Sequence, residues 1–165
     1  MRIKFKKQQF QIDAVKSVVD CFRGQLNKVS NFQLDTGRAR GELEGQVAFL
    51  NSIGFRNNPI GLTEDDVLKN IRKVQLRNGL KPSDRLEGRY NLTIEMETGT
   101  GKTYTYIRTM YELYRAYSWN KFIIVVPSIA IREGVYKSFQ ITEDHFMDLY
   151  GTKIRYFIYN SKQLH

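Results

Sequence analysis

Three features of the sequence predict an α/β fold in which helices flank a parallel sheet. Residues 92–96 alternate apolar and polar side chains, as a strand does. They lead directly into the glycine-punctuated segment 97–103 (ETGTGKT), after which residues 104–117 place apolar side chains at helical spacing. Residues 121–126 (KFIIVV) form the kind of β-branched and aromatic run that is typical of a strand buried on both faces of a parallel sheet. Strand, helix and strand in this order imply right-handed βαβ crossovers.

The segment 97–103 has the composition of a phosphate-binding loop. Gly99 and Gly101 have no Cβ, so the backbone can take a positive φ and turn successive N–H groups toward one anion. Lys102 would bring a positive charge to the β- and γ-phosphates of a nucleotide, and the Thr103 hydroxyl would ligate Mg²⁺. The usual pattern begins with a glycine that this chain lacks. The order of strand, loop and amphipathic helix still favours a nucleotide site over a chance turn rich in glycine and threonine.

The composition indicates a basic globular protein. A hydrophobic content of 41% with 13% aromatic residues excludes a disordered polyelectrolyte. Neither a bilayer-spanning apolar run nor a secretion signal is visible, so we expect a cytoplasmic protein. The one cysteine, Cys21, lies among apolar residues and is expected to be a buried structural thiol. The net charge of +9 favours a polyanionic partner, although a merely soluble basic surface has the same signature.

Residues 8–22 are predicted to form a helix that carries the candidate adenine-binding residue. Gln11 begins the pattern QxxAV in this segment. A glutamine amide offers a donor and an acceptor together, which matches the N6 and N7 edge of adenine, so Gln11 is the candidate for selecting ATP over GTP. Gln8 and Gln9 are the alternatives. A polar residue on an exposed helix face would look the same, and only the downstream loop favours the adenine role.

Residues 24–90 are expected to be rich in loops, with local helices, because they hold most of the chain's glycines. Thr63 followed by three acidic residues predicts the start of a helix that continues through residue 74. A shorter helix is expected over 44–53. The basic residues of the first of these helices form a face that is better explained as solvated than as phosphate-binding; they are Lys69, Arg72, Lys73 and Arg77.

The last third of the chain continues the predicted alternation. A helix is expected after Pro127-Ser128, then a helical turn over 142–150 and a third strand over 154–159. Residues 127–134 follow the carboxyl end of a predicted sheet strand, where open α/β folds place their ligands. Backbone N–H groups, the Ser128 hydroxyl and Arg132 could hold a nucleic-acid phosphate there, and an ordinary helix cap with a solvent-facing arginine explains the same pattern equally well.

The segments IEMETGTGKTYTYIRTMYEL and KFIIVVPSIAIREGVYKSF resemble the start of the superfamily 2 helicase-like motor in the Res subunit of type III restriction-modification enzymes. The pattern QxxAV resembles the Q motif of that family. The resemblance implies a P-loop NTPase (RecA-like) fold, which is a partial parallel sheet with flanking helices plus a loop-rich, mostly helical insertion. It implies three parts: residues 1–23 with the Q-motif-like helix, the insertion 24–90, and the P-loop βαβ core 91–165, truncated before the Walker B motif.

The resemblance also implies which residues act. Lys102 and Thr103 would be the catalytic residues, and Thr103 would ligate the Mg²⁺ that accompanies ATP. The implied nucleotide-binding residues are Gln11, Thr98, Gly99, Thr100, Gly101, Lys102 and Thr103. The implied contacts with the DNA backbone are Pro127, Ser128, Ile131, Arg132 and Gly134. The resemblance further implies double-stranded DNA as substrate, a methyltransferase (Mod) partner that reads the DNA site, and cleavage driven by ATP hydrolysis.

The sequence lacks several parts of that family's pattern. It has no acidic DExx motif, no second motor domain and no nuclease motif. We therefore expect an N-terminal part of a longer prokaryotic protein, which by itself hydrolyses ATP negligibly. The alternatives are another superfamily 2 motor such as a type I restriction or repair helicase, a small P-loop kinase, and a DNA-binding or assembly module that binds no nucleotide.

Overall fold

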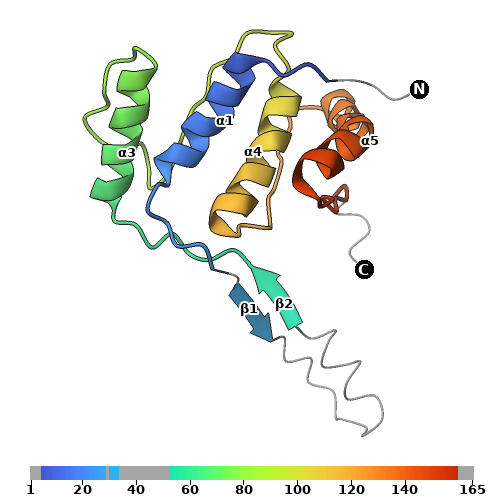
Figure 1. Cartoon of the computed structure of the whole chain (residues 1–165), viewed down its shortest axis with the longest axis horizontal. Coiled ribbons are helices and arrows are strands. Elements are labelled where there is room, and N and C mark those ends of the chain that lie inside the picture. The colour runs from blue at the N-terminus through green and yellow to red at the C-terminus, as the bar shows by residue number, and fades with distance from the viewer. Residues whose placement is uncertain (1–4, 29, 34–52, 160–165) are drawn as a thin grey trace, which may run out of the picture. The chain divides into compact units, whose positions relative to one another are not determined.

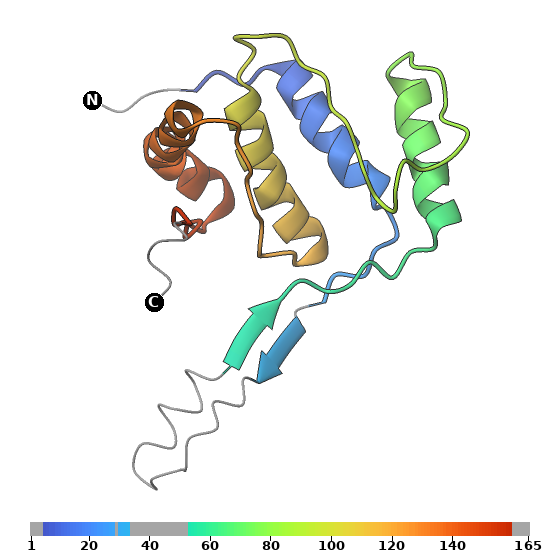
Figure 2. The ribbon, with the colours of Figure 1, turned by 180° about the vertical axis from the view of Figure 1, so that it is seen from behind.

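The computed structural model describes residues 5–28, 30–33 and 53–159. Its elements in chain order are α1 (Gln9–Cys21), β1 (Ser30–Gln33), β2 (Ile53–Arg56), α3 (Glu64–Arg77), α4 (Lys102–Tyr117) and α5 (Ile129–Tyr150). The chain divides into two compact units, Lys7–Val125 and the pair of segments Met1–Lys6 and Val126–His165. Within the first unit α1 packs against both α3 and α4 and lies between them (Figure 1, and from behind in Figure 2).

The predicted helices are confirmed, apart from the one expected over 44–53. α3 begins at the predicted cap: the Thr63 hydroxyl accepts a hydrogen bond from the Asp66 N–H at 3.1 Å, and the Asp66 carboxylate accepts one from the Thr63 N–H at 3.3 Å. The helix expected after Pro127-Ser128 and the helical turn at 142–150 form a single helix, α5. The helix expected over 44–53 lies outside the described residues, apart from Ile53, which begins β2. Among the described helices, none combines the length and the apolar character that crossing a bilayer requires.

The described part of the chain contains no parallel sheet, so the predicted fold class is wrong. The three segments expected to be its strands, 92–96, 121–126 and 154–159, have no regular secondary structure and pair with no strand that the structure describes. The sheet that is present consists of β1 and β2, which are antiparallel and lie in the stretch expected to be mostly helical. A strand is stable only when its backbone groups pair with a neighbour. An apolar pattern in the sequence indicates which side chains are buried, but it does not indicate whether a partner strand is present.

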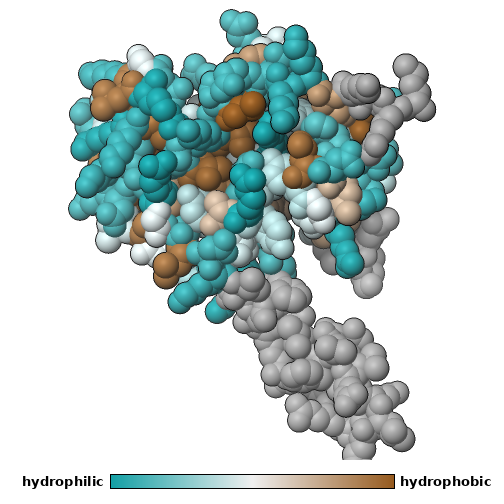
Figure 3. Space-filling model, in the orientation of Figure 1, coloured by the Kyte–Doolittle hydropathy of each residue, from teal (hydrophilic) through white to brown (hydrophobic). Residues whose placement is uncertain are grey.

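The segment 121–125 shows the consequence most clearly. Ile123 and Val125 are 92% and 88% exposed, whereas Phe122 and Ile124 are each 38% exposed. This alternation is that of an extended chain with two differently covered sides. The expected burial on both sides is therefore wrong. Elsewhere the visible face is largely hydrophilic, with separate small groups of apolar side chains (Figure 3).

The core of the first unit forms where α1, α3 and α4 meet. Its buried members are Cys21, Phe22, Val67, Ile71, Leu113, Tyr117 and Trp119. The indole of Trp119 packs edge-on against Phe22, with ring centroids 5.0 Å apart, and lies 5.3 Å from the ring of Tyr117. Its Nε1–H donates to the Asn58 carbonyl at 3.1 Å, so the buried indole has no unsatisfied polar atom. This cluster fixes the end of α4 that lies farthest from the predicted phosphate-binding loop.

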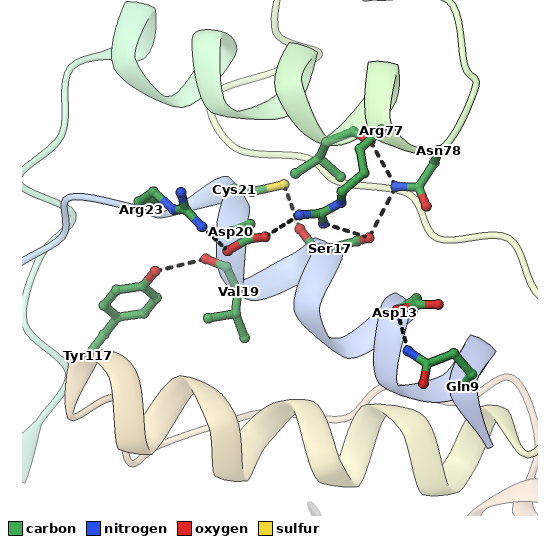
Figure 4. Close-up of polar contacts among 11 residues, drawn as sticks. Gln9, Asp13, Ser17, Val19, Asp20, Cys21, Arg23, Arg77, Asn78 and Tyr117 are labelled. Carbon is green, nitrogen blue, oxygen red and sulfur yellow. Dashed lines mark hydrogen bonds and ion pairs between the residues drawn. The ribbon is translucent and has the colours of Figure 1, made fainter. Parts of the chain in front are cut away.

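A group of polar contacts fastens the carboxyl end of α3 to α1 (Figure 4). The Asp20 carboxylate accepts hydrogen bonds from Arg77 at 2.5 Å and from Arg23 at 3.1 Å, and the Asn78 amide donates to the Ser17 hydroxyl at 3.2 Å. Burial acts to raise the pKa of Asp20, but the two guanidinium groups outweigh it and hold that pKa below its usual value. Because the folded-state pKa is lowered, this contribution to stability is present at neutral pH and is lost as the pH falls through it.

All four residues on the basic face of α3 are exposed, as the favoured interpretation predicted, and two of them also bond to neighbouring segments. Arg77 pairs with Asp20, and Arg72 donates to the backbone carbonyls of Ser83 and Asp84 at 2.8 and 2.9 Å. These two arginines connect α3 to neighbouring segments. The remaining two basic residues of the face are Lys69 and Lys73.

The second unit is organised around α5. The helix buries Phe139, Thr142 and Phe146, which are 7%, 5% and 1% exposed. Tyr156, from the extended segment that follows, stacks on Phe139 with ring centroids 4.6 Å apart. Of the apolar side chains expected to share one face of this helix, Phe139 is buried and Val135 half-buried, whereas Ile131 is 48% exposed.

The Cys21 thiol is buried, as predicted, and is 6% exposed. Its Sγ–H donates to the Ser17 carbonyl at 3.2 Å (Figure 4), and burial raises its pKa to about 11. We expect iodoacetamide at pH 8 to label the folded protein about a hundredfold more slowly than the urea-unfolded protein, because little thiolate forms and the reagent cannot reach it. Mass spectrometry of timed samples measures both rates. Similar rates in the two states would contradict the burial.

Candidate nucleotide-binding site

The predicted phosphate-binding loop forms a tight turn ahead of α4. The Thr100 N–H and hydroxyl both donate to the Glu97 carbonyl, at 3.4 and 2.6 Å. Gly99 and Gly101 have φ values of 81° and 84°, in the left-handed region that residues with a Cβ disfavour. Both glycines of the pattern are therefore required by the path of the backbone.

Lys102 folds back over this turn. Its Nζ donates to the Met96 carbonyl at 2.5 Å, and the side chain is otherwise exposed to solvent. A lysine ammonium has three hydrogens, so two remain for an anion while the third holds the start of the loop. The positive charge consequently lies beside the turn, and within the described ranges no salt bridge pairs it with a carboxylate.

The first turn of α4 lies directly behind the loop. Gly101 is the N-cap residue, and no side chain in the described part of the chain caps this helix end. The free N–H groups at a helix N-terminus carry a partial positive charge that favours an anion. Thr103, the candidate Mg²⁺ ligand, is half-buried in this turn. Together with Lys102, the helix end makes a site whose chemistry suits a phosphate group.

Thr105 supports the loop from inside, a role that the sequence pattern did not predict. Its hydroxyl donates to the Gly101 carbonyl at 3.2 Å, and its backbone N–H donates to the same oxygen at 3.0 Å. The side chain is 4% exposed. A threonine four residues after a glycine is the sequence signal that could have indicated this contact.

Gln11 reaches the loop from α1. The side chain is 9% exposed, which rules out the alternative of a solvent-facing polar residue, and its Nε2 donates to the Thr100 carbonyl at 2.9 Å. Of the alternative residues, Gln9 donates to Asp13 at 2.9 Å (Figure 4), and Gln8 is the N-cap residue of α1. The structure therefore brings Gln11 and the loop together although 89 positions separate Gln11 from Thr100.

The candidate DNA-contacting residues belong to the second unit, at the start of α5. Ser128 is the N-cap residue, and its hydroxyl accepts a hydrogen bond from the Ile131 N–H at 3.3 Å. Arg132 forms an ion pair with Glu133 at 2.9 Å. Pro127 and Gly134 are exposed. In this conformation the segment is an accessible helix start with a conventional hydroxyl cap.

Metal binding has no dedicated protein site in the described ranges. No group of three or more histidine, cysteine, aspartate or glutamate side chains is placed there to hold an ion.

Comparison with known proteins identifies the family. Residues 4–155 match the family model described as type III restriction enzyme, res subunit. The chain is 38% identical over 117 residues to the type III restriction-modification enzyme EcoPI Res subunit of Escherichia phage P1, a match that covers 68% of this chain and 12% of the relative. It is 37% identical over 111 residues to the EcoP15I Res subunit of Escherichia coli, covering 65% of this chain and 11% of the relative.

A third relative, the StyLTI Res subunit of Salmonella typhimurium, is 48% identical over 71 residues, which cover 41% of this chain and 7% of the relative. The chain thus spans about a tenth of the length of these curated relatives. The family model matches far more than half of the chain, and the similarity to the relatives lies within the same family. The chain belongs to the family of Res subunits of type III restriction enzymes.

Proposed function

We propose that this chain is the ATP-binding part of the motor of an ATP-dependent, DNA-translocating type III restriction endonuclease, an enzyme that cuts double-stranded DNA at specific sites. The observation that carries the proposal is the loop ahead of α4, where two left-handed glycines, Lys102 and an uncapped helix start come together within a chain of this family. Each of these features favours an anion, and the combination favours the triphosphate of a nucleotide.

The nucleotide would be held by residues 98–103 and Gln11. Lys102 would neutralise charge on the β- and γ-phosphates, and the Thr103 hydroxyl would ligate the Mg²⁺ that accompanies ATP. The bound metal would polarise the phosphate oxygens. Gln11 would contact adenine, because its amide lies beside the loop and offers both a donor and an acceptor.

DNA would contact the exposed start of α5. The backbone N–H groups there, the Ser128 hydroxyl and the remaining donors of Arg132 would hold a backbone phosphate, with Pro127, Ile131 and Gly134 shaping the contact. The net charge of +9 supports association with a polyanion. A methyltransferase (Mod) subunit would read the DNA sequence, and ATP hydrolysis would drive movement before cleavage.

The experiment that tests this function uses the full-length parent protein. ATP hydrolysis and DNA cleavage are measured with and without DNA and with and without the methyltransferase partner. We expect cleavage to require ATP, DNA and the partner together. Unwinding without the partner would instead indicate another superfamily 2 helicase, and phosphoryl transfer independent of DNA would indicate a kinase.

A further inference from the structure

One contact ties α1 to the phosphate-binding loop. The Gln11 Nε2 donates to the Thr100 carbonyl at 2.9 Å, and the glutamine side chain is 9% exposed. A buried amide that donates to a buried or half-buried carbonyl is held in place, because breaking the bond would leave both groups unsatisfied away from water. The orientation of the Thr100 carbonyl is therefore set by Gln11.

The direction of this carbonyl determines the direction of the next N–H. The peptide that joins Thr100 to Gly101 is planar and trans, so its N–H points opposite to its C=O. With the carbonyl turned toward Gln11, the Gly101 N–H points away from α1. An N–H of a phosphate-binding loop can donate to an anion only when it points toward the space that the anion occupies.

Gly101 provides a second, independent observation of the same arrangement. A Cβ at this position would lie 2.6 Å from the Gln11 Nε2, which is closer than real contacts allow. Any side chain there would displace the glutamine amide and break its bond to Thr100. The loop backbone and Gln11 are thus packed against each other with no space between them.

We propose that Gln11 is a positioning residue for the phosphate-binding loop, whose amide holds the Thr100 carbonyl so that the Gly101 N–H stays available to a phosphate. The proposal rests on the proposed nucleotide role of the loop. It goes beyond a contact with adenine, since it makes the binding of phosphate depend on Gln11 as well. The amide keeps a second Nε2 hydrogen and the Oε1 acceptor, so the same side chain can also contact a base and thereby connects base and phosphate binding.

A probe that has phosphates but no base separates the two roles. Binding of inorganic tripolyphosphate and of ATP, each with Mg²⁺, is measured by calorimetry for the full chain and for Gln11→Ala and Gln11→Glu. The glutamate variant keeps the size of the side chain but cannot donate to the Thr100 carbonyl. We expect both variants to bind tripolyphosphate about tenfold more weakly than the wild type, and to lose at least as much affinity for ATP. Unchanged tripolyphosphate binding with weaker ATP binding would overturn the proposal and leave Gln11 as a base contact alone.

Gln25→Ala is the matched control. Gln25 is also 9% exposed and also binds backbone groups, donating to the Pro59 carbonyl at 3.2 Å and accepting from the Gly61 N–H at 2.8 Å. We expect this variant to lower the free energy of unfolding without weakening the binding of tripolyphosphate to the folded protein. A loss equal to that of Gln11→Ala would show a general effect on the fold and would overturn the positioning role.

A measurement on the protein without ligand tests the positioning role independently of nucleotide binding. The amide signals of Thr100 and Gly101 are followed by NMR, together with the hydrogen exchange of the Gly101 amide. We expect Gln11→Ala to shift these signals and to speed the exchange, and Gln25→Ala to leave both unchanged. Unchanged loop signals in Gln11→Ala would overturn the proposal even if ATP binds. Absence of binding in the wild-type chain would instead contradict the proposed function.

Discussion

Replacing Lys102 with alanine is expected to reduce ATP-dependent DNA cleavage by the full-length parent protein at least about a hundredfold. The side chain is exposed, and its ammonium donates to the Met96 carbonyl at the start of the loop. The substitution removes the charge that would neutralise the β- and γ-phosphates, and no other residue of the loop can supply it. Because no buried contact is lost, we expect the free energy of unfolding to change by less than about 1 kcal/mol.

Cleavage and ATP hydrolysis assays on the full-length protein measure the first effect, and urea denaturation followed by circular dichroism measures the second. Lys16→Ala is the matched control, because it removes the same charge from an exposed position on α1 outside the loop. This control should cleave DNA like the wild type. An Lys102→Ala protein that still cuts DNA in an ATP-dependent way would refute the proposed role of the loop.

Replacing Trp119 with alanine is expected to lower the free energy of unfolding by about 3–5 kcal/mol. The indole is 7% exposed and contacts Phe22 and Tyr117, so its removal leaves a cavity between α1 and the end of α4. The Asn58 carbonyl also loses its hydrogen bond. A loss of this size is a large part of the stability of an ordinary domain and would unfold much of the population at moderate urea concentrations.

Urea denaturation followed by circular dichroism at 222 nm is the measurement, since Trp119 is the one tryptophan of the chain and its fluorescence disappears with the substitution. Trp119→Phe keeps a ring in the core and loses the hydrogen bond and part of the indole volume, so we expect a smaller loss of about 1–2 kcal/mol. Tyr114→Ala, an aromatic residue on α4 that is 46% exposed, should cost less than about 1 kcal/mol. Equal losses in Trp119→Ala and Tyr114→Ala would contradict the assigned core.

Local rules were sufficient for the helices and for the loop. The cap at Thr63, the periodicity of residues 104–117 and the glycines ahead of Lys102 all act over a few residues, and the structure shows helices and positive φ values at these places. Such features depend on backbone sterics and on hydrogen bonds between near neighbours in the sequence. These features can therefore be predicted from the sequence without knowledge of the tertiary contacts.

Pairing and packing between distant segments required the tertiary structure. The apolar run 121–126 predicted a strand inside a parallel sheet, but the described chain offers it no partner, and the pairing that occurs is the antiparallel β1–β2 ladder. In the same way, the pattern around Gln11 suggested a contact with a base, and only the fold revealed its bond to the Thr100 carbonyl. Contacts between segments so far apart depend on how the whole unit buries its apolar surface, which no local pattern encodes.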